Sequence, residues 1–262
     1  MERMKTQKKI VVIVMLLFFF VPAYAQFDTE TYDSTENLIL YQRQRTFGVV
    51  LHNLGLGVQF RSGKRTSYFK TRMWEIEFVS MKSYKQVKVL NPYFTNSRRY
   101  VYGKLNEAFF LRGGMVWKKL LNRKPYWGGV ELRWLYGGGV SVGFAKPYYL
   151  YVLYFYDTGN GFYSYDIKTE RFDPSSQSWD DIYGRAPFTV GFSEMTFHPG
   201  IYLKTALNFE FGVRSTKIKA LEVGATLDIS PMGLSIMADN KNQIFFPTIF
   251  LNFSFGKRFN KY

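Results

Sequence analysis

The feature of this chain that most constrains its fold is an alternation of large apolar residues with small or charged ones, at a period of two. The alternation is clearest between Trp127 and Lys146. One face of that segment would carry Val130, Leu132, Trp134, Tyr136, Val140, Val142 and Phe144. The other face would carry Glu131, Arg133, Gly137, Gly139, Ser141 and Gly143. A period of two predicts a β-strand that separates two different environments.

The same alternation recurs along the chain and predicts eight strands, with turn residues between them. The predicted strands are Thr46–Arg61, Ser67–Lys82, Ala108–Leu121, Trp127–Lys146, Pro147–Tyr156, Gly200–Ser215, Ile218–Ser230 and Ile244–Lys257. Because Tyr100-Val101-Tyr102-Gly103 also has strand character, a count of ten is the alternative.

The amino terminus predicts export from the cytoplasm. Four basic residues precede the apolar run Ile10 to Val21, which is followed by Pro22-Ala23-Tyr24-Ala25. This order is typical of a secretory signal peptide that is cleaved after Ala25. The run is 12 residues long, whereas a membrane-spanning helix needs about 20. We therefore expect a signal peptide at 1–25, a periplasmic lead segment at 26–45 and a barrel at 46–262.

The composition favours a membrane barrel over a soluble β-sandwich. Aromatic residues make up 19% of the chain, and there is no Cys to form stabilising disulfides. Aromatic girdles at both membrane interfaces explain such a composition, and a closed sheet pairs its own backbone groups in lipid. The sequence thus predicts an all-β, transmembrane, antiparallel outer-membrane β-barrel.

The last strand adds a resemblance to this prediction. The chain ends Phe253-Ser254-Phe255-Gly256-Lys257-Arg258-Phe259, and internal phrases include 72–78, 183–188 and 218–222. Together they resemble small outer-membrane β-barrels of the Bacteroidota type. The resemblance implies the fold and a location in the bacterial outer membrane, and it implies no activity.

Charged residues on the predicted inner face form a candidate lumen network. The residues assigned to it are Glu75, Glu77, Arg112, Glu131, Arg133, Glu210, Arg214 and Glu222. Arg61, Lys204 and Asp228 share the same predicted face. Side chains just fill an eight-stranded barrel, so we expect these charges to pair and to leave no open channel. A narrow proton or ion path is the alternative.

A basic, aromatic segment is the candidate docking surface for lipid or a partner. Residues 61–107 hold 11 basic and three acidic residues, within a chain of net charge +15. The candidate docking residues are Lys82, Lys85, Lys88, Arg98 and Arg99. Residues 157–187 have the opposite character, with six acidic and three basic residues. We expect outer-membrane lipid, lipopolysaccharide or an envelope protein as partner, and no nucleic acid, because the chain is exported.

The long connections pose a topological problem for this strand assignment. With both chain ends in the periplasm, the eight predicted strands place 157–197 outside the cell. They place 83–107 in the periplasm, where connections are usually short.

Other chemistry has little support in the sequence. His52 and His198 are the two histidines, so no zinc-ligand cluster is expected. Neither has a Ser two or three residues away on the same strand face, as acyl hydrolysis would favour. The glycines at 137–143 lie inside a predicted strand, which does not fit a phosphate-binding loop. We predict no metal, no cofactor and no catalytic residues.

The sequence therefore favours a non-enzymatic barrel that acts as a structural or accessory subunit in envelope assembly or protein secretion. A small pore or transporter is the second hypothesis, and a lipid-modifying barrel enzyme is the third.

Overall fold

The computed structural model describes residues 41–94, 96–123, 129–157, 159, 163–212, 216–238 and 242–260, all within one compact unit. The predicted signal peptide and residues 26–40 lie outside the described residues. The described part is built from strands and one short 3₁₀ helix, Phe192–Glu194. None of its helices is long and apolar enough to cross a membrane.

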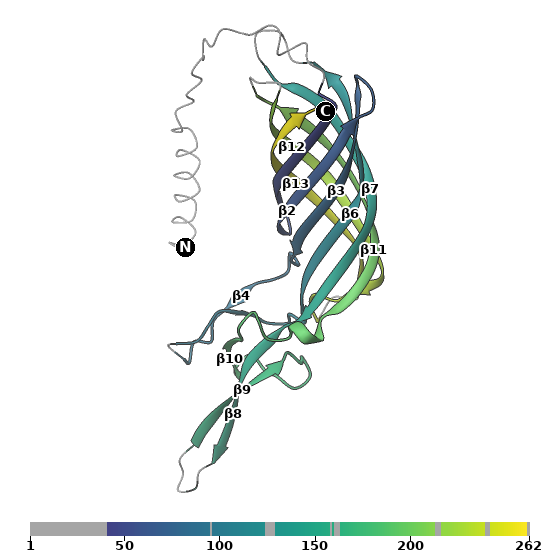
Figure 1. The fold of residues 1–262 in the computed structure, drawn as a ribbon. Coiled ribbons are helices and arrows are strands. Elements are labelled where there is room, and N and C mark those ends of the chain that lie inside the picture. The colour runs from purple at the N-terminus through teal and green to yellow at the C-terminus, as the bar shows by residue number, and fades with distance from the viewer. Residues whose placement is uncertain are drawn as a thin grey trace, which may run out of the picture. The chain divides into compact units, whose positions relative to one another are not determined.

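Eight strands form a closed antiparallel barrel (Figure 1). They are β1 (Arg43–His52), β2 (Gly55–Arg65), β3 (Lys70–Met81), β6 (Asn106–Asn122), β7 (Glu131–Pro147), β11 (Thr196–Glu210), β12 (Lys217–Leu234) and β13 (Gln243–Phe259). Each pairs with its sequential neighbour in the barrel, and β1 closes the ring on β13, from Arg43 opposite Phe259 to His52 opposite Phe250. The closed ring leaves no free sheet edge. The predicted fold class and the count of eight are confirmed.

Two of the predicted strands were nevertheless assigned wrongly. The predicted strand Thr46–Arg61 is two barrel strands, β1 and β2, which turn at Asn53-Leu54 and pair His52 with Gly55. The predicted barrel strand Pro147–Tyr156 lies outside the barrel, where β8 (Tyr149–Asp157) pairs with β9 (Tyr163–Arg171) and β10 (Ile182–Arg185). The two errors cancel in the count because one predicted strand is two barrel strands and the other lies outside the barrel.

The corrected turn also resolves the topological problem. The barrel's first and last residues, Arg43 and Phe259, pair at one end, which we call the terminal end. The β1–β2 turn lies at the opposite end, and so do both long connections, 82–105 and 148–195. The prediction that Ser83–Glu107 lies on the side of the chain ends was wrong, since the missed turn reverses the direction of β2, β3, β6 and β7. The two remaining short strands, β4 (Lys88–Val89) and β5 (Tyr100–Val101), pair only with each other, so the alternative of ten barrel strands is excluded.

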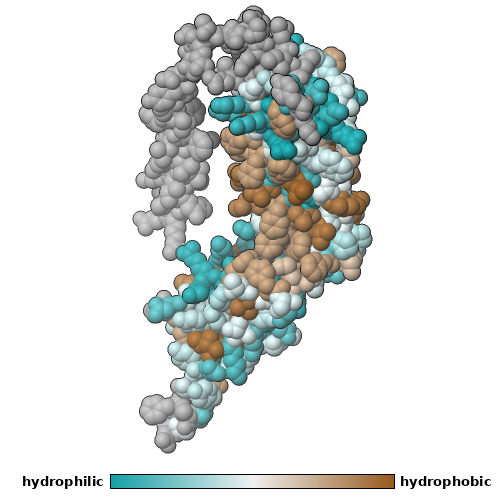
Figure 2. All heavy atoms as spheres, in the orientation of Figure 1, coloured by the Kyte–Doolittle hydropathy of each residue, from teal (hydrophilic) through white to brown (hydrophobic). Residues whose placement is uncertain are grey.

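The barrel wall has the reversed polarity of a protein in lipid. Along β3 the outward residues Trp74, Ile76 and Phe78 are exposed, while the inward residues Glu75 and Glu77 are buried. Other outward residues such as Val140 and Ile249 are about two-thirds exposed, at 64% and 68%. Figure 2 shows this apolar belt as brown surface around the middle of the barrel. Apolar-out and polar-in alternation is characteristic of transmembrane β-barrels.

Aromatic rings border the belt at both ends. Near the end opposite the terminal end, Phe78 stacks on Phe109 at 5.8 Å and Phe144 meets Phe197 at 5.3 Å. Near the terminal end, Trp134 meets Tyr136 at 4.8 Å. At about 3.3 Å per residue and a tilt of about 40°, Trp134 and Phe144 are roughly 25 Å apart along the barrel axis. That spacing matches the apolar height of an outer-membrane barrel.

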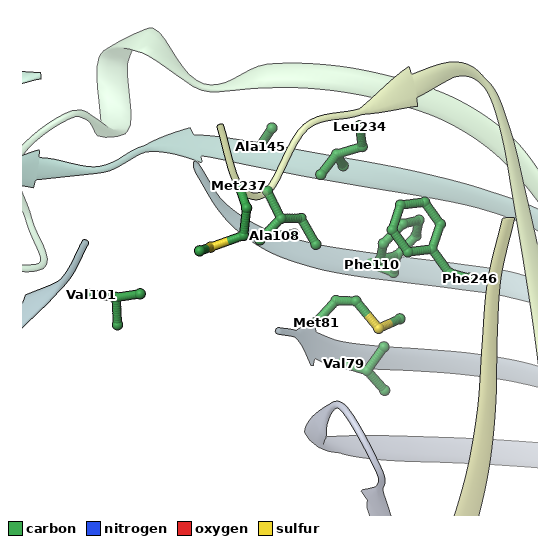
Figure 3. Close-up of a cluster of buried hydrophobic side chains, with 10 residues drawn as sticks. Val79, Met81, Val101, Ala108, Phe110, Ala145, Leu234, Met237 and Phe246 are labelled. Atoms are coloured by element: carbon green, nitrogen blue, oxygen red, sulfur yellow. The ribbon is translucent and has the colours of Figure 1, made fainter. Parts of the chain in front are cut away.

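An apolar cluster closes the interior at the end where the long connections lie. Phe110 and Phe246 meet at 5.2 Å between ring centres, and Val79 and Met81 pack in the same cluster (Figure 3). Val101 reaches the cluster from β5. Residues of the long connections thus help to seal the barrel.

A charge placed in the apolar belt should disfavour insertion into lipid. We expect Ile76→Lys to lower the free energy of unfolding from bilayers by about 2–4 kcal/mol, because Ile76 faces the middle of the belt. Urea titration of protein folded into lipid vesicles measures this change. Thr66→Lys, in the exposed β2–β3 turn, is the matched control and should change stability little. Equal stability of Ile76→Lys and the control would contradict the proposed lipid-facing surface.

Candidate functional site

The middle of the barrel holds a buried ion-pair network. Arg61 Nε lies 2.6 Å from Glu75, and Arg61 Nη1 lies 2.6 Å from Glu222. All three side chains are completely buried. The Nζ of Lys118 lies 3.1 Å from Glu222. One arginine therefore joins strands β2, β3 and β12 across the lumen.

A second buried arginine completes the network. Arg112 holds Asp228 through Nε at 2.9 Å and Nη2 at 2.5 Å, and it also pairs with Glu77. Lys204 bridges Glu77 to Glu75, with its Nζ 2.8 Å from Glu75. The four carboxylates just named thus share four cations, so their charges balance. A buried carboxylate is tolerated only when it is paired and hydrogen-bonded.

Neutral side chains donate further hydrogen bonds to these carboxylates. Gln59 donates to Glu75 at 2.9 Å and to Glu77 at 2.7 Å. Asn208 and Asn252 each donate to Glu222 at 2.8 Å. The side chains of the network fill the cross-section together with the apolar clusters, as expected for eight strands. The lumen of the described barrel is packed rather than open.

Glycines in the wall make room for one member of the network. Gly114 lies opposite Gly139, and a Cβ on Gly114 would come within 2.7 Å of the Tyr202 hydroxyl. That hydroxyl donates to Glu75 at 3.2 Å. The glycine run around Gly139 is part of strand β7, which agrees with the prediction that it is not a phosphate-binding loop.

The predicted lumen residues divide into two groups. Glu75, Glu77, Arg112 and Glu222 belong to the central network. A second group lies toward the terminal end, where Glu131 pairs with Arg133 and Glu210 pairs with Arg258 at 2.5 Å. Arg214 lies outside the described residues.

The sequence analysis missed several members of the network. Lys118 has the same parity along β6 as Arg112, so the alternation could have identified it. Gln59, Asn208, Asn252 and Tyr202 carry no charge, whereas the predicted network consisted of charged residues only.

Removal of one central cation should destabilise the barrel strongly. We expect Arg61→Leu to lower the free energy of unfolding by about 3–5 kcal/mol, because Glu75 and Glu222 would lose a buried partner. Chemical denaturation in detergent micelles or vesicles measures the change. Thr66→Leu, at an exposed position one residue beyond the end of the same strand, is the control. A loss below about 1 kcal/mol for Arg61→Leu would show that the network is not needed to fill the lumen.

Beyond the barrel, the two long connections fold together into what we call the extension, residues 82–105 and 148–195 (Figure 1). Its centre is an apolar cluster contributed by both connections and by flanking residues. The buried members are Tyr100, Tyr148, Leu150, Val152, Phe172 and Ile182. The extension therefore has a core of its own, separate from that of the barrel.

Specific hydrogen bonds join the two connections. The side-chain amide of Asn91 donates to the carbonyls of Asp180 at 3.1 Å and Ile182 at 2.9 Å. The Tyr100 hydroxyl donates to the Trp179 carbonyl at 3.0 Å. Burial raises the pKa of Tyr100 to about 12, so its hydroxyl keeps the proton that it donates. The basic and acidic connections thus bind each other through part of their surface.

A buried carboxylate attaches the extension to the barrel rim. Glu107, the second residue of β6, lies 2.8 Å from Arg185 of β10, 3.4 Å from Lys104 and 3.6 Å from Lys146. Lys146 also donates to the carbonyl of Val190 at 3.0 Å. Burial lowers the pKa of Lys104, while the charge of Glu107 opposes this effect. One carboxylate therefore gathers cations from the extension and from the barrel.

Neutralising Glu107 should loosen the extension without unfolding the barrel. Glu107→Gln would leave three cations close together with no carboxylate between them, which is unfavourable in a buried position. We expect about tenfold faster amide hydrogen exchange in β10 and β9, and unchanged exchange in β12. Mass spectrometry of exchanged peptides measures this. Glu170→Gln is the control, because Glu170 only accepts an exposed hydrogen bond from the Tyr154 hydroxyl. Equal effects of the two substitutions on exchange would contradict the role of Glu107.

The surface of the extension carries both exposed aromatic residues and charge. Each predicted docking residue is exposed there: Lys82, Lys85, Lys88, Arg98 and Arg99. Tyr84 and Tyr93 are 78% and 70% exposed, and the β8–β9 hairpin exposes Phe155 and Tyr156. Residues 82–105 contain no acidic residue. The five predicted docking residues therefore lie on one segment, residues 82–105, at the end of the barrel that carries the extension.

The two histidines lie at the extension end of the barrel. His52 is the last residue of β1, and its Nδ1 accepts a hydrogen bond from the Leu54 amide at 3.3 Å. His198 lies 3.1 Å from the Thr196 hydroxyl and lines a pocket of about 330 Å³ with Glu194, Ser235 and Asn242. In the described part of the chain, neither histidine is hydrogen-bonded to a Ser hydroxyl. Within the same residues, no group of three or more Asp, Glu or His side chains is placed to hold a metal ion.

Comparison with known proteins adds a distant structural likeness. No family model matches the sequence, and no curated protein matches it. Among solved structures, the chain is similar to Ail, the attachment invasion locus protein of Yersinia pestis. The match has a TM-score of 0.36 and 8% identity, and it covers 84% of this chain and 100% of that chain. Values this low transfer no property of that protein to this one.

Proposed function

We propose that this protein is an outer-membrane barrel that acts as a non-enzymatic structural or accessory subunit. In this proposal the terminal end faces the periplasm and the extension projects from the cell. The apolar belt, its aromatic borders and the length of the connections at one end support this placement. Kinship with small barrels of the Bacteroidota type rests on the sequence motifs given above.

The observation that carries the docking role is the extension. It is folded around its own core, so its shape is set before any partner binds. It nevertheless exposes large aromatic residues beside lysines, among them Tyr84 beside Lys85. Aromatic residues are enriched at contact surfaces between proteins, and exposed basic residues give charge complementarity to an acidic partner. An envelope assembly or protein-secretion complex is the setting we favour.

The packed lumen favours this function over a pore. Four buried cations and four buried carboxylates occupy the middle of the barrel, and an apolar cluster closes one end. Stepwise conductance in planar bilayers would favour the pore instead. The enzyme hypothesis would gain from altered lipid acylation that is lost when His198 is replaced.

Charge reversal on the extension should weaken partner capture. We expect Lys82→Glu/Lys85→Glu/Lys88→Glu to reduce recovery of a co-purifying envelope protein about tenfold, while the barrel stays folded. Purification in mild detergent, followed by quantitative mass spectrometry, measures recovery of the partner. Heat-modifiable migration in gel electrophoresis shows whether the barrel is folded. Thr66→Glu/Asn122→Glu, exposed at the terminal end, is the control. Unchanged recovery in the triple variant would remove the basis for docking through this segment.

A further inference from the structure

The terminal end of the barrel carries a ring of outward-facing basic residues. Along each of six strands the lipid-facing stripe changes from apolar to basic toward this end. On β3, for example, Phe78, Ile76 and Trp74 are followed by Arg72 and Lys70, all exposed. The residues of this basic ring are Arg43, Arg45, Lys64, Lys70, Arg72, Lys119, Lys217, Lys219 and Lys257, all exposed. Their strands are neighbours in the barrel, in the order β6, β3, β2, β1, β13 and β12.

Several of these cations lie directly opposite one another in the sheet. Lys64 is the register partner of both Arg43 and Arg72. Lys257 is the partner of both Arg45 and Lys217. Like charges directly opposite each other on one face of a sheet are destabilising. An arrangement repeated on six strands therefore favours an anionic partner that lies between the cations.

The chain itself does not neutralise the ring within its described residues. At the terminal end the acidic residues described are Glu131 and Glu210, and these pair with Arg133 and Arg258 toward the lumen. None of the ion pairs among described residues includes a member of the basic ring.

The position of the ring indicates which anion it meets. The cations continue the same face that contacts lipid, and they begin two residues beyond belt residues such as Trp74 and Phe47. At about 3.3 Å per residue along a tilted strand, that step moves about 5 Å toward the water. This is the depth at which a bilayer changes from hydrocarbon to phosphate head groups. Figure 2 shows hydrophilic surface at this end, directly next to the brown belt.

We propose that the basic ring binds the phosphate groups of anionic phospholipids in the leaflet next to the terminal end. The inference rests on the proposed membrane location but not on the docking role of the extension. Attraction between the ring and an anionic leaflet would fix the height of the barrel in the bilayer. It would also offset the repulsion between cations across the strands.

Electron paramagnetic resonance of spin-labelled lipids tests the proposal. The whole protein is reconstituted into phosphatidylcholine vesicles that contain trace spin-labelled phosphatidylglycerol or phosphatidylcholine. We expect an association constant for phosphatidylglycerol about fivefold or more above that for phosphatidylcholine, since each Lys or Arg near the surface contributes about that factor. High salt should reduce the preference, because it screens exposed charges.

Matched variants assign the preference to the ring. Arg43→Gln/Lys64→Gln/Arg72→Gln should reduce it by at least half, and so should Lys217→Gln/Lys219→Gln/Lys257→Gln on the neighbouring strands. Lys168→Gln/Arg171→Gln removes two exposed basic residues of the extension and should leave the preference unchanged. Equal association of the two lipids, or an unchanged preference in both ring variants, overturns the proposal.

A deletion variant tests whether the anionic partner of the basic ring is lipid or the acidic segment 27–39 of the chain itself. Residues 27–39 contain Asp28, Glu30, Asp33 and Glu36 and no basic residue. If phosphatidylglycerol preference arises only when residues 27–39 are deleted, this segment is the partner of the ring, and the lipid assignment is overturned. Failure of the protein to float with vesicles would instead contradict the membrane location itself.

Discussion

The structure depends on the closure of its sheet, in which β1 pairs with β13 over ten consecutive register positions. Closure satisfies the backbone hydrogen bonds of the barrel wall, so the outward side chains are free to be apolar. It also fixes the interior volume, because eight strands leave a space that side chains just fill. Charged residues in that space must find partners there. The network around Arg61 and Arg112 follows from this constraint.

The extension follows from the same geometry at the barrel rim. Both long connections leave from one end, so they emerge side by side and can share a core. Gly184 illustrates how close they come, since a Cβ there would lie 2.7 Å from the Arg98 carbonyl oxygen. Opposite net charges in the two connections favour this association. Glu107 then attaches the extension to the barrel by collecting cations from both.

The two ends of the barrel therefore differ in kind. The extension end combines aromatic rings with a folded, mixed-charge structure, whereas the terminal end presents cations on six neighbouring strands. The basic stretch 61–107 was predicted as a single docking segment. In the structure it holds members of three separate sites. Arg61 is buried in the lumen, Lys64 and Arg72 are on the basic ring, and Lys82 is on the extension. Local charge density did not distinguish these sites. Their residues differ in their position along a strand and in the face of the sheet on which they lie.

The sequence by itself determined the fold class and the face of the sheet on which each strand residue lies. Those properties are local, since alternate residues of any strand point to opposite sides. It did not determine where strands turn or which segments pair. The turn at Asn53-Leu54 and the exclusion of β8 from the barrel depend on contacts between residues far apart in the chain. Tertiary structure alone decided that Glu77, Arg112 and Asp228 meet in one network, and that basic residues from six strands form a ring, because strand pairing sets the register.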